Sequence, residues 1–236
     1  NNVPLFTAVK DSSLLSLMES KCNNTNSEFV KVDFERLIIH KMDLDSSNFS
    51  YQGFNNLEIK LSGMHQIENS ILAIEVVNYL NKKSNLHISC ELLYEGLIST
   101  TWPGRLECVS NNPLIYIDGG HNIDCIKRVC EFVNHLSFDY KRVVISISND
   151  KDKKSMIDLL DHTFNELIFT KYSYKRSASD NELFSLSKSP NKHIIHDMFE
   201  VIDYCFNNQV PFTLFIGSLY LISEIRPIIL NYNKKN

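Results

Sequence analysis

Several features that would assign a protein to a class at once are missing from this sequence. No apolar run approaches the roughly 20 residues that cross a bilayer. The start of the chain, residues 3–9, lacks the basic flank of a signal peptide and contains Pro4. The net charge of -4 gives no general attraction to nucleic acid or to an acidic membrane surface. We therefore expect a cytoplasmic protein whose partners include neither nucleic acid nor a membrane.

Paired cysteines are missing too. The six cysteines form no C-x-x-C motif, and most of them lie in apolar stretches of sequence: Cys22, Cys90, Cys108, Cys125, Cys130 and Cys205. Neither a disulfide framework nor a zinc site is indicated by such scattered positions. The sequence predicts reduced thiols that are buried.

Glycine is scarce, with seven in the chain: Gly53, Gly63, Gly96, Gly104, Gly119, Gly120 and Gly217. None of them belongs to a G-x-x-x-x-G-K-[ST] loop, whose backbone amides cradle nucleotide phosphates. Any bound anion must therefore be held by other groups of this chain. Because the chain begins at Asn1 and not at a methionine, we also expect that an upstream segment is missing.

The overall amino-acid composition is that of an ordinary folded protein. The 236 residues, 43% of them apolar and 22% charged, suffice for one large core or two smaller ones. The pattern changes at Trp102-Pro103-Gly104, where proline bars a helix and glycine frees the backbone. We place a domain boundary here, between residues 1–101 and 102–236, with Trp102 packed at the hinge.

The first part has the pattern expected for the end of a domain. It contains buried strands near residues 3–9 and 29–32, a helix capped by Asp11 with apolar Leu14, Leu15, Leu17 and Met18, and a hairpin over 48–61 that turns at 53–56. A helix follows the turn at Gly63, and Ser89 caps another. The polar stretch between residues 32 and 48 gives no clear pattern.

Strands and helices alternate regularly after the boundary. Strands are predicted at 108–110, 114–118, 143–148, 167–170, 193–195 and 212–216, and helices at 123–136, 155–160, 181–186, 198–206 and 219–229. Such repetition implies an α/β fold with a doubly wound, mostly parallel sheet of about 130 residues.

Polar groups and glycines follow three of these strands. They are Asp118-Gly119-Gly120-His121, Asn149-Asp150-Lys151-Asp152 and Gly217-Ser218. In a parallel sheet the three turns share one edge, where ligands bind, and a carboxylate at Asp118 could accept from a ribose hydroxyl. The same residues also suit a plainer interpretation, with Asp118 as a helix cap and His121 as an ordinary first-turn residue. The 149–152 turn has the composition of a solvated loop.

Five ordered motifs together resemble a known family. They are Leu61-Ser62-Gly63-x-His65-Gln66-x-x-Asn69, Trp102-Pro103-Gly104-Arg105-Leu106, Asp118-Gly119-Gly120-His121-Asn122, Asp150-Lys151-Asp152 and Gly217-Ser218-Leu219-Tyr220-Leu221. Their order and spacing resemble the folylpolyglutamate synthase and dihydrofolate synthase family, ATP-dependent ligases related to the Mur ligases. The His65-Gln66 pair and the P-G-R-L link resemble the folate branch more than the Mur ligases or cyanophycin synthetases.

This resemblance implies a fold and a reaction. Residues 1–101 would be the end of a Mur-ligase-type central ATPase domain, and residues 102–236 the Rossmann-like C-terminal domain that binds glutamate. A folate or dihydropteroate carboxylate would attack the γ-phosphate of ATP, and the amine of L-glutamate would displace phosphate from the acyl phosphate. ATP and Mg²⁺ would be the cofactors and the full-length protein a monomer. The choice between dihydropteroate and folate, and the glutamate chain length, stay open.

The resemblance also assigns roles to residues. Asn69, Arg105 and Asp118 would bind ATP, His121 would be catalytic and contact glutamate, and Ser218 would hold glutamate, while His65 and Gln66 would position a helix end. No metal ligand is assigned in this chain: the Mg²⁺ ligands would lie mainly in the missing upstream part, because the family's G-T-N-G-K-G-S loop and metal-associated lysine are missing from this sequence. We therefore expect the chain alone to be inactive. Two alternatives remain: a non-catalytic remnant that binds a nucleotide or a partner, and another Mur-type amide ligase.

Overall fold

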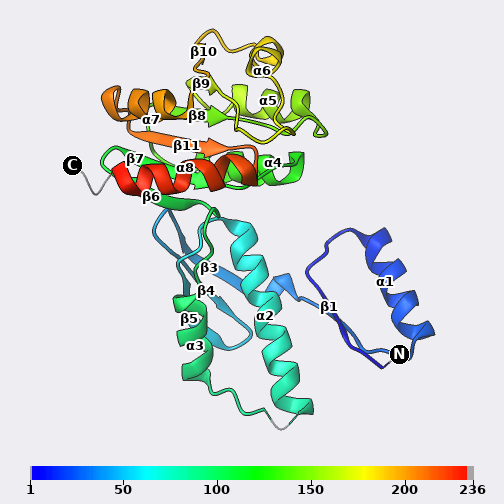
Figure 1. Ribbon diagram of the computed structural model, residues 1–236. Coiled ribbons are helices and arrows are strands. Elements are labelled where there is room, and N and C mark those ends of the chain that lie inside the picture. Colours follow the sequence, from blue (N-terminus) through cyan, green and yellow to red (C-terminus); the bar gives the residue numbers. More distant parts are fainter. Residues whose placement is uncertain (1, 85, 233–236) are drawn as a thin grey trace. The chain divides into compact units, whose positions relative to one another are not determined.

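The computed structural model describes residues 2–84 and 86–232. The chain divides into two compact units, Asn1–Thr101 and Trp102–Asn236, and each is described separately below (Figure 1).

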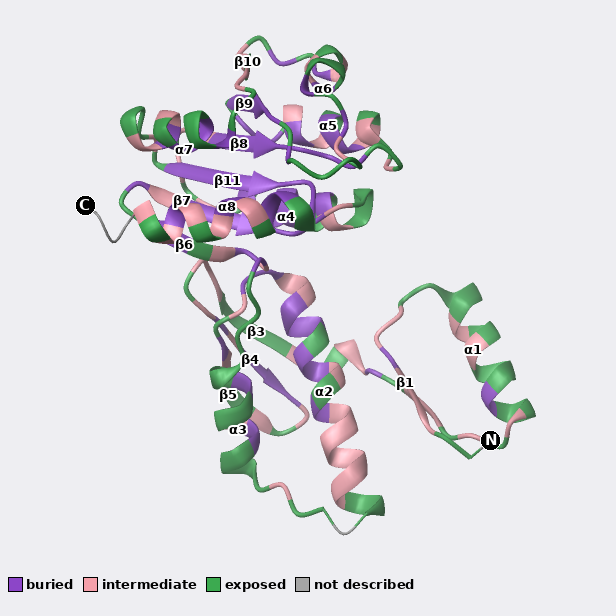
Figure 2. Cartoon of the chain, in the orientation of Figure 1, coloured by how far each residue is buried: buried purple, intermediate pink, exposed green. Residues whose placement is uncertain are grey.

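A parallel pair of short strands opens the first unit. Strands β1 (Leu5–Thr7) and β2 (Phe29–Lys31) are joined by helix α1 (Ser12–Asn24). The helix begins as predicted, since an oxygen of Asp11 accepts from the N–H of Leu14 at 2.9 Å. Its apolar side chains are largely uncovered, with Leu14 48% and Leu17 68% exposed. Figure 2 shows this helix mostly exposed or half-buried.

The main core of the first unit lies between an antiparallel sheet and two helices. The elements are η1 (Phe34–Arg36), β3 (Leu37–Met42), β4 (Ser47–Tyr51), β5 (Phe54–Ile59), α2 (Met64–Lys83) and α3 (Cys90–Ser99), with β4 central in the sheet. Phe49, Leu57 and Ile71 are fully buried between the sheet and the helices. Gly63 and Ser89 stand at the starts of α2 and α3, as expected from the sequence.

The second unit contains the predicted doubly wound sheet. Its strands are β6 (Glu107–Asn111), β7 (Leu114–Asp118), β8 (Lys141–Ile145), β9 (Glu166–Phe169), β10 (Lys192–Ile194) and β11 (Phe212–Ile216). They lie in the order β10-β9-β8-β11-β7-β6, and all neighbours pair in parallel except β6, which runs antiparallel to β7 at one edge. The α/β prediction with a mostly parallel sheet is confirmed.

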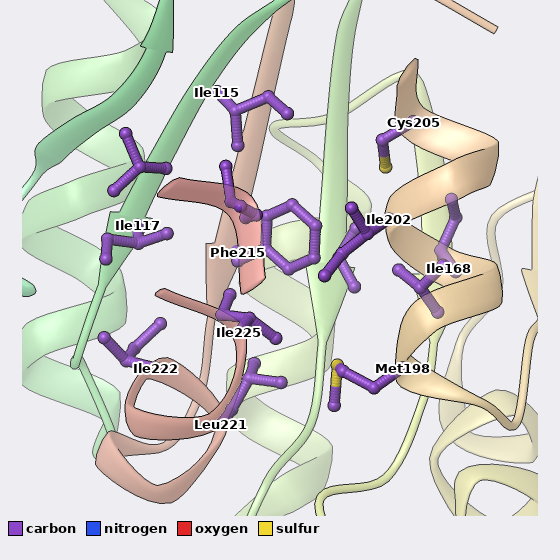
Figure 3. Packing of buried hydrophobic residues seen from close by; sticks show 14 of the residues in the cluster. Ile115, Ile117, Ile168, Met198, Ile202, Cys205, Phe215, Leu221, Ile222 and Ile225 are labelled. Carbon is purple, nitrogen blue, oxygen red and sulfur yellow. The ribbon is translucent and has the colours of Figure 1, made fainter. Parts of the chain in front are cut away.

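Helices cover both faces of this sheet. They are α4 (Ile123–Asn134), α5 (Lys153–Asp161), α6 (Asp180–Leu186), α7 (Met198–Asn207) and α8 (Leu219–Tyr232). Ile117 and Phe215 point toward α7 and α8, where Ile202 and Ile225 meet them in one apolar cluster (Figure 3). Helix α4 packs beside α5, and α5 beside α6. Because side chains alternate along a strand, Tyr116 points to the face opposite Ile117.

A buried ion pair joins the beginnings of two central strands. Arg142 and Glu166 are register partners on β8 and β9, and the side chains are only 2% and 4% exposed. Nε of Arg142 donates to Oε2 of Glu166 at 2.9 Å, and another guanidinium nitrogen donates to the carbonyl of Asn208 at 2.8 Å. The hydroxyl of Tyr204 donates to Oε1 of Glu166 at 3.0 Å. These hydrogen bonds compensate much of the cost of burying two charges.

Two expectations from the sequence are wrong. Trp102 is 65% exposed, so it does not pack as a core side chain at the boundary. All six cysteines are free, but Cys90 and Cys108 are exposed and only Cys22, Cys130 and Cys205 are buried. In the described ranges, every helix is too short or too polar to traverse a bilayer.

Candidate functional site at the carboxyl edge of the sheet

Three strand ends lie side by side in the second unit. Ile216 at the end of β11 pairs with Asp118 on one side and with Ile145 on the other. The turns that follow β7, β11 and β8 therefore share one edge, as predicted. The helix after β11 covers one face of the sheet, whereas the helices after β7 and β8 cover the other. This is the topological switch point at which open α/β sheets bind ligands.

Asp118 lies beneath the surface of this edge. Its side chain is 2% exposed, and its two oxygens accept from backbone N–H groups, Oδ2 from Leu106 at 2.9 Å and Oδ1 from Gly120 at 2.7 Å. Burial raises the pKa of Asp118, while these N–H groups and the charges of Arg105 and His121 oppose the shift. The alternative interpretation as a helix cap is wrong, because Asn122 caps α4 by accepting from the N–H of Cys125 at 2.9 Å.

Arg105 follows Gly104, whose N–H and carbonyl are both hydrogen-bonded, and we call this short segment the link. The carbonyl of Gly104 accepts from the N–H of Gly119 at 2.7 Å, and the N–H of Gly104 donates to Glu107 at 2.8 Å. Glu107 in turn forms a two-pronged ion pair with Arg226 of α8, with contacts of 2.7 to 3.0 Å. Arg105 itself is half-buried. The fastened link keeps a guanidinium close to the Asp118 turn.

His121 is half-buried, with its ring turned back on its own turn. Nδ1 lies 3.0 Å from the carbonyl oxygen of Gly119. A carbonyl oxygen can only accept, so Nδ1 must carry the proton. In the neutral tautomer with its proton on Nδ1, the lone pair is on Nε2, which can take a proton from a ligand.

The glycines of the turns allow close backbone packing. A Cβ on Gly119 would stand 2.3 Å from a methyl carbon of Leu219. Gly217 has a φ of +118°, and a Cβ there would lie 2.6 Å from the carbonyl oxygen of Ser146. A side chain at Gly217 would collide with backbone, whereas one at Gly119 would require the end of the Leu219 side chain to move aside.

Ser218 and Asn69 are placed differently. Ser218 is 1% exposed, and its hydroxyl oxygen accepts from the N–H of Tyr220 at 3.1 Å, so it caps the first turn of α8. Asn69 belongs to the first unit, where it is exposed in the first turns of α2 and donates to Gln66 at 3.3 Å. The structure thus gathers Arg105, Asp118, His121 and Ser218 in one unit and Asn69 in the other.

Two acids in the turn after β8 stabilise the local structure. Asp152 caps α5 by accepting from the N–H of Ser155 at 3.2 Å, and Asp150 forms an ion pair with Arg176 at 2.9 Å.

The sequence did not single out Arg176 or the tyrosines near it. Rings of Tyr172 and Tyr174 stack on Tyr220 with centroids 5.6 and 4.6 Å apart. The signal that could have found them is the basic and aromatic composition of residues 171–176.

Over residues 2–84 and 86–232, no group of three or more His, Cys, Asp and Glu side chains could hold a metal ion. The expectation that this chain contributes no metal site stays a prediction.

The sheet topology and the helices on both faces define a Rossmann-like α/β fold. Solved structures share it: the folylpolyglutamate synthase of Thermotoga maritima superposes with a TM-score of 0.82 at 26% identity, over 100% of this chain and 56% of that chain. The Mycobacterium tuberculosis folylpolyglutamate synthase complexed with ADP has the same fold, with a TM-score of 0.82 at 17% identity over 95% of this chain and 54% of that chain.

Sequence similarity to curated proteins indicates which α/β proteins this chain resembles. The dihydrofolate synthase/folylpolyglutamate synthase of Bacillus subtilis is 29% identical over 95% of this chain and 54% of its own length. The folylpolyglutamate synthase of Lacticaseibacillus casei is 25% identical over 97% of this chain and 54% of its own. No family model matches the chain. The chain thus spans about half the length of the curated relatives it matches, and its resemblance to folylpolyglutamate and dihydrofolate synthases is confirmed.

Proposed function

We propose that this chain supplies part of the nucleotide and glutamate site of an ATP-dependent ligase, which joins L-glutamate to a folate or dihydropteroate through an acyl phosphate. The observation that carries the proposal is the similarity to a dihydrofolate synthase/folylpolyglutamate synthase over 95% of the chain. The convergence of three motif turns at one sheet edge supports it, because the reaction must bring two anions together.

Arg105 is the proposed contact to the nucleotide phosphates from the second unit. A guanidinium keeps its charge throughout the reaction and offers a planar fork that matches phosphate oxygens. The hydrogen bonds of Gly104 on either side of the link support this role, since they fix the backbone that carries the guanidinium. Asn69 is the proposed contact from the first unit, where its amide is exposed.

His121 is the proposed catalytic residue. The amine of glutamate must lose a proton before or during its attack on the acyl phosphate, and a neutral imidazole can accept that proton at Nε2. The Nδ1 contact with Gly119 favours this tautomer. After the transfer, the charged ring would stand near the departing phosphate and offset its charge.

Asp118 and Ser218 support the site from beneath. The carboxylate of Asp118 holds the Leu106 and Gly120 amides, so we propose that its effect on ATP is exerted chiefly through Arg105 and His121. Ser218 would hold glutamate at the start of α8. Mg²⁺, when bound with ATP, would shield the β- and γ-phosphates. The complexes with ADP and AMPPCP are those of the Mycobacterium tuberculosis folylpolyglutamate synthase.

The test is a ligation assay on the complete gene product. We expect L-glutamate, ATP and a folate or dihydropteroate to give phosphate and a product heavier by one glutamyl residue, as measured by mass spectrometry. Nucleotide binding without such a product, whichever of the two acceptors is supplied, would favour the non-catalytic remnant. A product with a different amino acid would favour another Mur-type amide ligase.

A further inference from the structure

A basic loop lies on the same edge of the sheet as the candidate site. We define it as residues 171–176, Lys-Tyr-Ser-Tyr-Lys-Arg, which follow β9 and contain no acid. Lys171, Lys175 and Arg176 are all exposed. Three more cations, Lys151, Lys153 and Lys154, follow β8, the neighbouring strand. These six cations stand against two acids in the same two segments, Asp150 and Asp152, so positive charge is in excess here although the net charge of the chain is -4.

The basic loop is held firmly against its neighbours. The hydroxyls of Tyr172 and Ser148 are 2.7 Å apart, and the carbonyl of Arg176 accepts from the N–H of Asn149 at 2.8 Å. On the other side, the N–H and hydroxyl of Ser173 donate to Glu224 of α8, at 2.7 to 3.1 Å. These ties fix the backbone, so its cations are presented from a defined surface.

The nearby acids make their contacts with residues other than the two lysines. Asp150 pairs with Arg176, and Glu182 pairs with Lys153 at 3.0 Å. Glu224 is occupied by Ser173. Within the described part of the chain, Lys171 and Lys175 take part in no ion pair. They remain available to an anionic ligand.

The basic loop also begins close to the turn that would hold glutamate. Strand β9 is the second neighbour of β11, so its end lies about 10 Å from the Gly217-Ser218 turn at the usual strand spacing. Tyr220, two residues beyond Ser218, forms ring contacts with Tyr172 and Tyr174. A ligand that extends from the glutamate position along this edge would pass the turn after β8 and then reach the lysines.

We propose that the basic loop binds the γ-linked glutamate chain of a folate substrate or product. This inference rests on the proposed ligase function and extends it to chain length. Each γ-linked residue leaves one α-carboxylate free, so the chain is a flexible row of anions. Exposed lysines suit such a ligand because they attract carboxylates without demanding one fixed geometry.

The experiment compares oligo-γ-glutamate peptides of one and five residues, without a pteridine, by titration of the 236-residue chain. We expect the longer peptide to bind up to about tenfold more tightly. Each lysine should contribute about threefold, as exposed ion pairs do. The double variant Lys171→Glu/Lys175→Glu should lose this advantage, whereas Lys127→Glu/Lys188→Glu, which changes the same charge at exposed positions elsewhere, should keep it.

Three outcomes would overturn the inference: no preference for the longer peptide, the same preference in the Lys171→Glu/Lys175→Glu variant, or equal binding of inorganic polyphosphate of matched charge. The ligation assay is a separate measurement. Loop-dependent peptide binding without ligation would overturn the proposed ligase function alone. Ligation with unchanged peptide binding in the double variant would overturn the role of the basic loop alone.

Discussion

The carboxylate of Asp118 accepts a hydrogen bond at 2.9 Å from the backbone N–H of Leu106, a residue held at a φ of +42°. A leucine in this left-handed region is strained by about 1 kcal/mol or more. Leu106 is also buried, so the surrounding contacts over-determine its conformation. The buried acid thereby fixes the course of the link that carries Arg105.

Replacing Asp118 with Asn should lower the free energy of unfolding by about 1 to 3 kcal/mol, because an amide nitrogen would face one of the two N–H donors. Urea denaturation measures this change. Asp124→Asn, at an exposed position in the first turn of α4, is the control and should cost less than about 0.5 kcal/mol. Equal stabilities of the two variants would show that the Asp118 hydrogen bonds contribute nothing.

The stability contribution of Asp118 should depend on pH with a defined sign. Burial raises the pKa of this carboxyl in the folded protein, so the native state keeps the proton to a higher pH than the unfolded chain. The contribution is therefore fully present below the ordinary Asp value of about 4 and is lost as the pH rises through the folded-state pKa. The stability difference between wild type and Asp118→Asn should shrink over that rise. A difference that grows instead would contradict the raised pKa.

His121→Ala should lower the rate of glutamate ligation by the complete gene product about 100-fold or more, as expected for loss of a proton acceptor. His162→Ala is a matched control, because its Nδ1 also lies against a backbone carbonyl, that of Asp158, at 2.6 Å, but at the end of α5. The control should retain its rate. An unchanged rate would show that the histidine has been misassigned.

Two glycine substitutions should have opposite effects. Gly217→Ala should destabilise the protein by about 2 kcal/mol or more, since the new Cβ combines a positive φ with a contact at 2.6 Å to the Ser146 carbonyl oxygen. Gly96→Ala lies within α3, where a Cβ meets nothing within 4 Å, and should stabilise by about 0.5 to 1 kcal/mol. Thermal unfolding distinguishes the two, and a destabilised Gly96→Ala would contradict the expected helix geometry.

The cysteines should differ sharply in reactivity. Burial raises the pKa of Cys130 to about 11 and that of Cys205 to about 12, so both thiols stay protonated and enclosed at neutral pH. Cys90 and Cys108 are exposed. Mass spectrometry after brief iodoacetamide treatment should find these two labelled, and Cys130 and Cys205 unlabelled until denaturant is added. Early labelling of Cys205 would indicate that the region around α7 opens.

The sequence predicts the second unit well because each of its elements has a strong local signal. The strands at 114–118 and 212–216 match the structure residue for residue, since each is a continuous apolar run closed by a turn. Strand β3 was missed for the opposite reason. Ile38 and Ile39 are adjacent and both exposed, so the edge strand shows no alternation to detect.

The candidate site shows a similar division. Motif order located the turns that contain Asp118, His121 and Ser218, and strand register brings these turns together. The burial of Asp118 could not be predicted, because it depends on a hydrogen bond from Leu106, twelve residues earlier in the chain. The exposure of Trp102 was missed because composition alone favours a large aromatic side chain in a core.

The Arg142–Glu166 pair lies at the beginnings of β8 and β9, whereas the glycine turns and the basic loop follow strand ends. Substitutions in the turns at one edge of the sheet can therefore leave the buried ion pair at the other edge unchanged. Loops after the strands can lengthen or exchange charges without touching the ion pair between the central strands. The parallel direction of the strands thus separates the edge whose turns can vary from the edge whose ion pair stabilises the fold.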